Sequence, residues 1–451
     1  MTRPLDDTHD PGLRSWVASA NDPAGDFPIQ NLPLGVFRRR GRSDVPRLGV
    51  AIGDQVLDLR RCGELRLLDG PPEVVAAARE ASSLNRLLAL GPEAHGSLRR
   101  AVSTVLRADG SRAEPGALVP LADAELRLPV EVGDYTDFYA SIVHARNVGR
   151  LFRPDHPLPP SYRHVPLAYH GRSSSLVVSG IPVKRPCGQR PPAGGERPSF
   201  GPTERLDYEL ELGAWVGAGS LPGRPVSIDD AERHLGGFCL VNDWSARDLQ
   251  AWEAQPLGPF LSKSFATSVS PWMVTLDALA PFRCPAARPA GDPPPLPHLA
   301  SARNDALGGL DVTVEAWLES AEMRRRGIGP MRLSRARFRE MYWTVAQMVA
   351  HHTSNGCPLR PGDLLASGTV SGPEDDAAGC LLERAATGTP ATLPTGERRG
   401  FLADGDEVTL RAYCSRDGFA RIGFGSCSVR VLSASGGSPE SRSGQSLARR
   451  G

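Results

Sequence analysis

Charged and apolar residues alternate along the stretch 206–212, whose sequence is Leu-Asp-Tyr-Glu-Leu-Glu-Leu. Successive side chains of an extended strand point to opposite faces, so Asp207, Glu209 and Glu211 would share one face. Three like charges repel one another unless water or a cation lies against them. Because Asp and Glu are mostly exposed in proteins, the alternation alone favours a solvated face. A metal platform is the alternative, and the apolar stretch 213–217 supports it by indicating a buried strand.

Four further polar clusters stand at the ends of apolar runs and could meet this strand. They are Asp137 with His144; Asp243 with Arg247 and Gln250; Lys263 with Thr267; and Ser367 with Gly368 and Thr369. Hard divalent cations prefer oxygen ligands, and carboxylates that converge from separate strands form Ca²⁺ or Mg²⁺ sites. Such a site would take four carboxylates from these clusters: Asp137, Glu209, Glu211 and Asp243. The chain has no Cys-x-x-Cys pair, which argues against zinc.

The composition is that of a soluble globular protein with about two domains. The chain has 451 residues, of which 40% are hydrophobic and 23% charged, and its net charge is +1. This balance favours neither nucleic acid nor a membrane surface as a partner. The 48 Gly and 42 Pro indicate many turns and a strand-rich fold. The eight cysteines are scattered, so we expect a cytoplasmic protein without disulfides.

The pattern along the chain predicts four parts. Residues 1–24 are polar and rich in Pro, Gly and Asp, and we expect a disordered N-terminal extension. Residues 25–128 combine strand signals with a helical pattern and indicate a small β-rich domain. We expect residues 129–432 to form the larger domain, which contains the polar clusters and would be the catalytic one. The Ser/Gly/Arg-rich stretch 433–451 is expected to be a flexible tail.

Three elements of the larger domain must position the polar clusters. The pattern predicts one helix over 135–152, which would place Asp137 and His144 on one side of it, two turns apart. A buried strand is expected to end at Asp243, which can cap the helix that follows. Glu383 is expected in an apolar strand, where a buried carboxylate needs a partner. His144 is the candidate partner.

Several long strings of residues, in the same order along the chain, resemble those of the fumarylacetoacetase family. They are 26–33 (DFPIQNLP), 134–139 (DYTDFY), 144–149 (HARNVG), 169–172 (YHGR), 242–248 (NDWSARD), 256–261 (PLGPFL), 365–369 (LASGT) and 404–408 (DGDEV). The resemblance runs from about residue 26 to about residue 431. The small N-terminal domain favours this family over the shorter members of the wider superfamily.

The resemblance implies a mainly β (α+β) fold, with a small N-terminal SH3-like barrel domain and a larger C-terminal mixed β-sandwich roll. It implies a homodimer. The implied reaction is hydrolysis of the carbon–carbon bond of fumarylacetoacetate to fumarate and acetoacetate, the last step of tyrosine and phenylalanine degradation. Ca²⁺ and Mg²⁺ are the implied cofactors, and no nucleic-acid or membrane partner is expected.

The resemblance also implies roles for individual residues. The implied metal ligands are Asp137, Glu209, Glu211 and Asp243, with Lys263 and Thr267 at a second, Mg²⁺ or monovalent-cation site. The implied catalytic residues are the base His144, its partner Glu383, and the oxyanion-stabilising Arg247, Gln250 and Lys263. The implied substrate-binding residues are Tyr139, Arg153, Tyr169, Gln250 and Thr369.

Two other functions stay open on the sequence. A tyrosine that contacts substrate in the family is here Ala254. This difference leaves room for a related reaction, such as acylpyruvate hydrolysis or decarboxylation of a β-keto acid. A non-catalytic, metal-stabilised scaffold is the second alternative. Asp207 is expected to face solvent and is not counted among the ligands.

Overall fold

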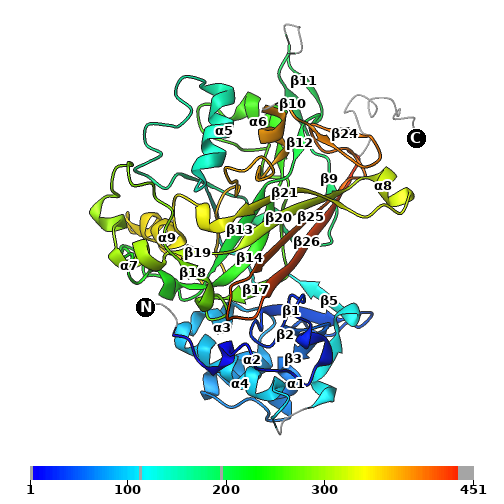
Figure 1. The fold of residues 1–451 in the computed structure, drawn as a ribbon, viewed down its shortest axis with the longest axis vertical. Coiled ribbons are helices and arrows are strands. Elements are labelled where there is room, and N and C mark those ends of the chain that lie inside the picture. Colours follow the sequence, from blue (N-terminus) through cyan, green and yellow to red (C-terminus); the bar gives the residue numbers. More distant parts are fainter. Residues whose placement is uncertain (1–3, 111–113, 193–196, 387, 435–451) are drawn as a thin grey trace, which may run out of the picture.

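The structure is a computed structural model that describes residues 4–110, 114–192, 197–386 and 388–434. It is a mixed α+β fold in which strands predominate, as the sequence predicts. Figure 1 shows a smaller N-terminal part, in blue and cyan, against one end of a larger part that carries the long strands. Within the described ranges, no helix is both long and apolar enough to cross a bilayer.

Five antiparallel strands form the sheet of the N-terminal part, in the order β5-β1-β2-β3-β4. Its elements are β1 (Leu34–Arg39), β2 (Arg47–Ile52), β3 (Gln55–Asp58), β4 (Leu118–Pro120), β5 (Ala124–Arg127), α1 (Leu59–Glu64), α2 (Pro72–Glu80), α3 (Asn85–Ala89) and α4 (Pro92–Leu106). Strand β1 also pairs with β17 of the larger part, with Leu34 opposite Met273. The two parts therefore share one sheet, and closure of the N-terminal strands into a barrel stays a prediction.

Residues 4–24 pack against the N-terminal part. The side chain of Arg99, on α4, donates to Thr8 Oγ1 at 2.8 Å, and Trp16 Nε1 donates to the carbonyl of Val105 at 2.9 Å. Val17, within this segment, is buried in the core of the N-terminal part. The expectation of disorder is therefore wrong for these residues, because interactions with a helix about 90 residues later hold the polar segment in place. Residues 1–3 and the predicted tail from 435 onward lie outside the described residues.

Two sheets organise the larger part. The central sheet has the order β17-β14-β13-β22-β6-β7, with β16 beside β14 and β8 beside β16. Its strands are β6 (Tyr135–Phe138), β7 (Ala168–His170), β8 (Leu176–Val178), β13 (Leu210–Val216), β14 (Leu235–Asp243), β16 (Thr267–Val269), β17 (Trp272–Thr275) and β22 (Leu364–Ala366). The second sheet is β21 (Met331–Arg337), β20 (Thr313–Glu319), β25 (Glu407–Cys414), β26 (Ile422–Leu432) and β9 (Val183–Lys184).

In the residues that the structure describes, short strand pairs and six α-helices complete the larger part. The pairs are β10 (Cys187–Arg190) with β11 (Ser199–Pro202), β12 (Leu206–Asp207) with β15 (Ser245–Ala246), β18 (Arg283–Cys284) with β19 (Gly309–Leu310), and β23 (Ala391–Thr392) with β24 (Arg398–Arg399). The helices are α5 (Ile142–Phe152), α6 (Arg247–Glu253), α7 (Ala302–Leu307), α8 (Ala321–Arg325), α9 (Val345–Thr353) and α10 (Leu381–Ala386).

Strand β13 is buried on both faces. Its Leu212 and Ala214 belong to the core that also contains Val314 and Leu410 of the second sheet, whereas Trp215 belongs to the core shared with the N-terminal part. This follows from the period of two in a strand, because neighbouring side chains enter different cores. Charged residues at the start of this strand consequently lie inside the protein.

Two predicted elements are wrong. Residues 135–138 form strand β6, and the helix begins only at Ile142, where the Ser141 side chain accepts the backbone N–H of His144. This N-cap separates strand from helix, so Asp137 and His144 do not share a helix face. Glu383 lies in the short helix α10 and not in a strand.

Candidate active site

Four buried carboxylates converge at one edge of the central sheet. Asp137 comes from β6, Glu211 from β13 and Asp243 from the end of β14, while Glu209 lies immediately before β13. Each contributes an oxygen atom to a cluster in which all four atoms lie within 4.8 Å of one another. Strand pairing explains the convergence. Strand β22 lies between β13 and β6 and pairs with both, so the carboxylates of Glu211 and Asp137 lie at the same end of the strands.

The carboxylates of Asp137 and Glu211 are in an environment that favours a cation. Among the described residues, Oδ1 of Asp137 and both oxygens of Glu211 are buried without a hydrogen-bond partner. Burial, followed by the charge of Asp243, raises the pKa of Asp137 well above its usual range. Burial and the charge of Asp137 raise the pKa of Glu211 in the same way. A hard divalent cation would supply both the missing partner and the missing positive charge, so the residues fit a metal ion.

Glu209 and Asp243 already have cationic partners. The Nζ atom of Lys263 lies 2.6 Å from an oxygen of each, and Nη1 of Arg247 lies 2.8 Å from Oε1 of Glu209. Burial raises the pKa of Glu209, but the nearby charges of Lys263 and Arg247 bring it well below its ordinary value. Thr267 donates to Asp243 at 3.0 Å. The negative charge of Glu209 and Asp243 is therefore partly neutralised by bound cationic side chains. Asp137 and Glu211 have no such ion pair among the described residues.

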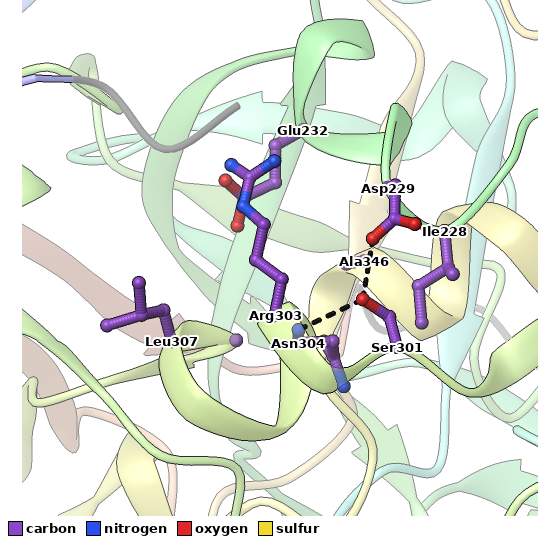
Figure 2. Close-up of a pocket in the computed structure, with 9 residues that line it drawn as sticks. Ile228, Asp229, Glu232, Ser301, Arg303, Asn304, Leu307 and Ala346 are labelled. Atoms are coloured by element: carbon purple, nitrogen blue, oxygen red, sulfur yellow. Dashed lines mark hydrogen bonds between the residues drawn. The ribbon is translucent and has the colours of Figure 1, made fainter.

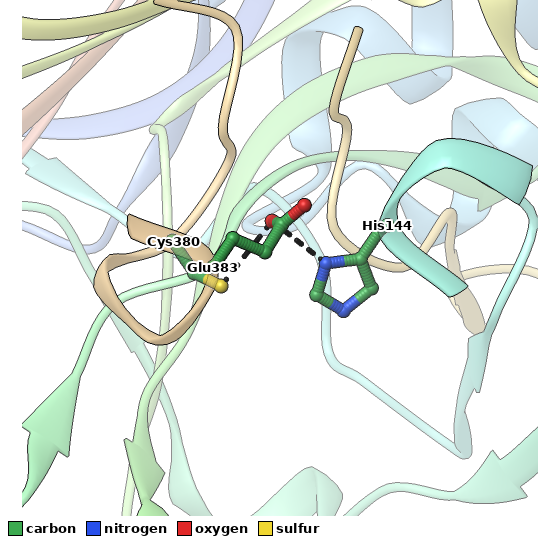
Figure 3. Close-up of side chains that lie close together, drawn as sticks. All are labelled: His144, Cys380 and Glu383. Atoms are coloured by element: carbon green, nitrogen blue, oxygen red, sulfur yellow. Dashed lines mark hydrogen bonds and ion pairs between the residues drawn. The ribbon is translucent and has the colours of Figure 1, made fainter. Parts of the chain in front are cut away.

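A histidine–carboxylate pair lies beside this network. Nδ1 of His144 is 2.8 Å from Oε2 of Glu383, and Figure 3 shows the two side chains facing each other. Burial raises the pKa of Glu383, but His144 and two further donors, Asn147 Nδ2 at 2.9 Å and Ser371 Oγ at 2.8 Å, hold it below its ordinary value. A carboxylate at Nδ1 places the proton of the neutral imidazole there, so Nε2 can accept a proton.

Cys380 is the third side chain in Figure 3. Its Sγ lies 3.3 Å from Oε2 of Glu383. Burial and the charge of Glu383 raise the pKa of this thiol well above its usual value. Only the thiolate is a good metal ligand, so the group of His144, Cys380 and Glu383 is better suited to proton transfer than to metal binding.

The remaining predicted residues lie around these two centres, with one exception. Tyr139 places its ring edge against His144, with centroids 5.4 Å apart, and Tyr169 donates to Oδ2 of Asp137 at 2.8 Å. Gln250 accepts from Arg247 at 3.1 Å, and Thr369 donates to Glu209 at 2.9 Å. Arg153 is exposed at the end of α5, where it donates to the carbonyl of Pro157 at 3.4 Å. Within the described residues it makes no hydrogen bond or ion pair with the other predicted site residues.

Sequence reasoning missed several residues that support the site, and Asp207 is the clearest correction. It does not face solvent: it is completely buried and accepts Nε of Arg247 at 3.0 Å. Asn147 could have been found, because it follows His144 by three positions on one helix and therefore shares its face. Ser371 carries no such signal, because its contact with Glu383 depends on the fold.

Two cavities differ in their relation to this chemistry. Figure 2 shows a small pocket of about 20 Å³, where Ser301 donates to Asp229 at 2.5 Å and accepts the backbone N–H of Asn304 at 3.2 Å. The bond from the N–H of Asn304 caps α7, so the position of Ser301 in this pocket has a structural explanation. A cavity of about 680 Å³ has Glu383 and Asn147 in its wall, so it opens beside the histidine–carboxylate pair.

Gly368 sets the position of the loop that carries Thr369. Its φ is +74°, and a Cβ there would overlap the carbonyl oxygen of Phe138. We expect Gly368→Ala to lower the free energy of unfolding by about 2–4 kcal/mol, measured by denaturant titration. Gly396 is the matched control, since its φ is +87° and a Cβ there meets open space. Gly396→Ala should cost about 1–2 kcal/mol, and an equal cost at both positions would contradict the overlap.

Comparisons with known proteins identify the family of this chain. Residues 30–129 match the family model "Fumarylacetoacetase N-terminal", and residues 135–432 match "Fumarylacetoacetate (FAA) hydrolase C-terminal". The chain is 46% identical to the fumarylacetoacetase of Oryza sativa subsp. japonica, covering 94% of this chain and 98% of that one. It is 45% identical to the fumarylacetoacetase of Homo sapiens, and the match covers 93% of this chain and 99% of that one.

Among solved structures, the fumarylacetoacetate hydrolase of Exiguobacterium antarcticum has a TM-score of 0.48 at 18% identity, and the match covers 89% of this chain and 99% of that one. By its matches to both family models and to these curated relatives over nearly their whole length, this chain belongs to the fumarylacetoacetase family.

Proposed function

We propose that this chain is a metal-dependent hydrolase that cleaves the carbon–carbon bond of fumarylacetoacetate to give fumarate and acetoacetate. One observation carries the proposal: Glu209 belongs to the acidic cluster and also binds Arg247 and Lys263, so a single buried network contains a metal platform and cationic donors. The pair His144–Glu383 supplies a base beside it. Curated relatives that are 41–46% identical share the name fumarylacetoacetase, so acylpyruvate hydrolysis and β-keto acid decarboxylation are not favoured.

The metal assignment rests on the chemistry of the donors. We assign Ca²⁺ to the four carboxylates of the acidic cluster, because a flexible all-oxygen site with several charges suits this ion. A second, Mg²⁺ or monovalent-cation site would lie beside Asp243, with Lys263 and Thr267 around it. When bound, a divalent cation supplies Lewis acidity to the carbonyl oxygens of the diketone.

The protein's own residues account for the proton transfers. Nε2 of His144 takes a proton from water as the water oxygen bonds to the fumaryl carbonyl carbon. Glu383 holds the imidazole tautomer and stabilises the imidazolium. The bond from the attacked carbon to the neighbouring methylene carbon then breaks, and its electron pair leaves with the acetoacetate enolate. The imidazolium then gives its proton to that carbon, which yields acetoacetate and returns His144 to its neutral form.

Donors around the attacked carbonyl would stabilise its developing negative charge. Nη2 of Arg247 is buried and, among the described residues, has no hydrogen-bond partner. Gln250 uses its oxygen on Arg247, so its amide N–H groups are available. Lys263 uses two bonds on Glu209 and Asp243 and has a third proton to donate. Each oxyanion donor of this kind contributes about 3 kcal/mol to the barrier reduction.

The dicarboxylate substrate calls for donors at both ends. We assign substrate contacts to Tyr139, Arg153, Tyr169 and Thr369, with Arg153 supplying the positive charge for one carboxylate. Because Arg153 lies apart from the other residues, this assignment requires the end of α5 to approach the bound substrate. We also propose a cytoplasmic homodimer that acts in tyrosine and phenylalanine degradation.

The direct test is turnover of fumarylacetoacetate by the purified protein, followed by loss of the diketone absorbance. We expect turnover with Ca²⁺ or Mg²⁺ and its disappearance after treatment with a chelator. An acylpyruvate and a β-keto acid serve as comparison substrates. Faster turnover of either, or no metal-dependent loss of absorbance with fumarylacetoacetate, would refute the proposal.

Metal binding is expected to release protons. Burial raises the pKa values of Asp137 and Glu211, so these carboxyls hold their protons more strongly than exposed carboxyls do, whereas a bound cation requires them ionised. Apparent Ca²⁺ affinity should therefore rise with pH until both carboxyls have lost their protons. Calorimetry of Ca²⁺ binding in buffers of different ionisation enthalpy measures the release, and a binding enthalpy that is independent of the buffer would contradict it.

A further inference from the structure

Asp207 makes four hydrogen bonds with two separate parts of the site. Its Oδ1 accepts the backbone N–H of Leu381 at 2.8 Å and of Tyr208 at 2.9 Å. Its Oδ2 accepts the backbone N–H of Leu382 at 3.0 Å and Nε of Arg247 at 3.0 Å. The side chain is completely buried, so water does not compete for these positions.

On one side, Asp207 determines the orientation of the Arg247 guanidinium. Nε is bonded to Asp207, and Nη1 is bonded to Glu209 and to Gln250. These contacts fix the plane of the guanidinium and leave Nη2 as its free donor. Loss of the contact at Nε would allow the plane to rotate and would move Nη2.

On the other side, Asp207 holds the first turn of α10. This helix has six residues, and Leu381 and Leu382 are its first two. Their N–H groups have no partner within the helix, so an external acceptor is needed. Glu383 is the next residue, and its carboxylate accepts Nδ1 of His144. A shift of the first turn would therefore displace the partner of the base.

We propose that Asp207 is a positioning residue that keeps the oxyanion donor Arg247 and the base pair His144–Glu383 in a fixed relative position through one carboxylate. The assignment of these two roles rests on the proposed function. An amide cannot replace this carboxylate. Asparagine has only one acceptor oxygen. Its amide group would therefore face either the N–H groups of Leu381 and Tyr208 or those of Leu382 and Arg247.

The test compares Asp207→Asn with Asp406→Asn. Asp406 is also completely buried and accepts two bonds from Arg399 and one from the backbone of Ala403. In the described part of the chain its side chain makes no hydrogen bond or ion pair with a predicted site residue. We expect D207N to lower kcat by about 100-fold, with KM and Ca²⁺ affinity unchanged, because small displacements of reacting groups have effects of that size. D406N should lose stability and keep its kcat. Equal kcat values in the two variants would overturn the proposal.

Double-mutant cycles distinguish positioning from a general loss of packing. If Asp207 acts through its two partners, the effect of D207N should shrink at least fivefold in an Arg247→Lys background and in a Glu383→Gln background. A full, multiplicative loss in both backgrounds would show that Asp207 does not act through them. If D207N does not fold, Asp207→Glu keeps both acceptor oxygens but moves them by one methylene. It should still lower kcat at least tenfold, and an unchanged kcat would refute positioning.

A spectroscopic measurement separates this proposal from the proposed function. The Nδ1 proton of His144, which is bonded to Glu383, should give a downfield NMR resonance at low temperature in the wild type and in D406N. We expect D207N to shift or broaden this signal. If the wild type does not hydrolyse fumarylacetoacetate, the function fails while this comparison still decides the role of Asp207. An identical resonance in all three proteins would rule out positioning of the base pair.

Discussion

His144→Ala is expected to lower kcat for fumarylacetoacetate by about 10²–10⁴-fold, the usual contribution of a general base. In the structure, Nδ1 of His144 is occupied by Glu383, so Nε2 is the nitrogen that can accept a proton from water. Alanine removes this acceptor and leaves the carboxylates of the acidic cluster in place. Ca²⁺ affinity, measured by calorimetry, should therefore stay within about threefold of the wild type.

A second histidine provides the control for this variant. His234 is partly buried, and its Nδ1 lies 2.8 Å from the carbonyl oxygen of Ala218, outside the site. His234→Ala should leave kcat unchanged while costing a similar amount of stability. If His144→Ala retained more than a tenth of the wild-type kcat, His144 would not be the general base. Loss of Ca²⁺ binding in the same variant would indicate a disturbed fold and not a missing base.

Glu211→Gln is expected to weaken Ca²⁺ binding by at least about tenfold and to stabilise the metal-free protein. Both oxygens of Glu211 are buried without a partner among the described residues, and they face the charges of Asp137 and Glu209. The amide is a poorer ligand for the cation, but in the metal-free protein it replaces a group whose ionised form is disfavoured by burial and by the neighbouring carboxylates. We expect the metal-free variant to gain about 1–3 kcal/mol at pH 7.

The sign of this effect follows from proton linkage. A carboxyl whose pKa is raised by folding makes the folded state bind more protons than the unfolded state above a pH of about 4.3. The wild-type, metal-free protein therefore loses stability as pH rises through that range, until the raised pKa is passed. Glutamine does not titrate, so the variant should show a flatter dependence of the free energy of unfolding on pH. Denaturant titration of chelated protein at several pH values measures it.

Glu315 is the matched control, because it is a buried glutamate that has partners. It binds Arg335 at 2.7 Å and accepts Nε1 of Trp317 at 3.1 Å. Glu315→Gln should weaken the ion pair with Arg335 and lower stability, whereas Glu211→Gln raises it. Opposite signs at the two positions would support an uncompensated charge at Glu211. Destabilisation by both variants in the absence of metal would exclude it.

Local patterns in the sequence predicted part of the strand that carries Glu211 and the burial of the residues after it. The alternation predicted one strand over 206–212, and strand β13 confirms its second half, including Glu211; the first half is the separate strand β12, and Glu209 lies between the two strands. The buried stretch after Glu211 was also evident from its composition. The main local error was to overlook the N-cap at Ser141. As a result, strand β6 and helix α5 were predicted as one helix. The residue type and its position could have revealed it.

Long-range contacts decided the rest. Asp207 carries the same alternating signal as Glu209, yet it pairs with Arg247, 40 residues later, and with Leu381, 174 residues later. The N-terminal segment is ordered because Arg99 binds it. Whether a carboxylate is solvated, paired or left without a partner depends on which strands become neighbours in the sheet. The sequence by itself determined the residue types and the local direction of their side chains; the tertiary structure alone decided their burial and partners, because these depend on contacts between distant segments that leave no periodic signal.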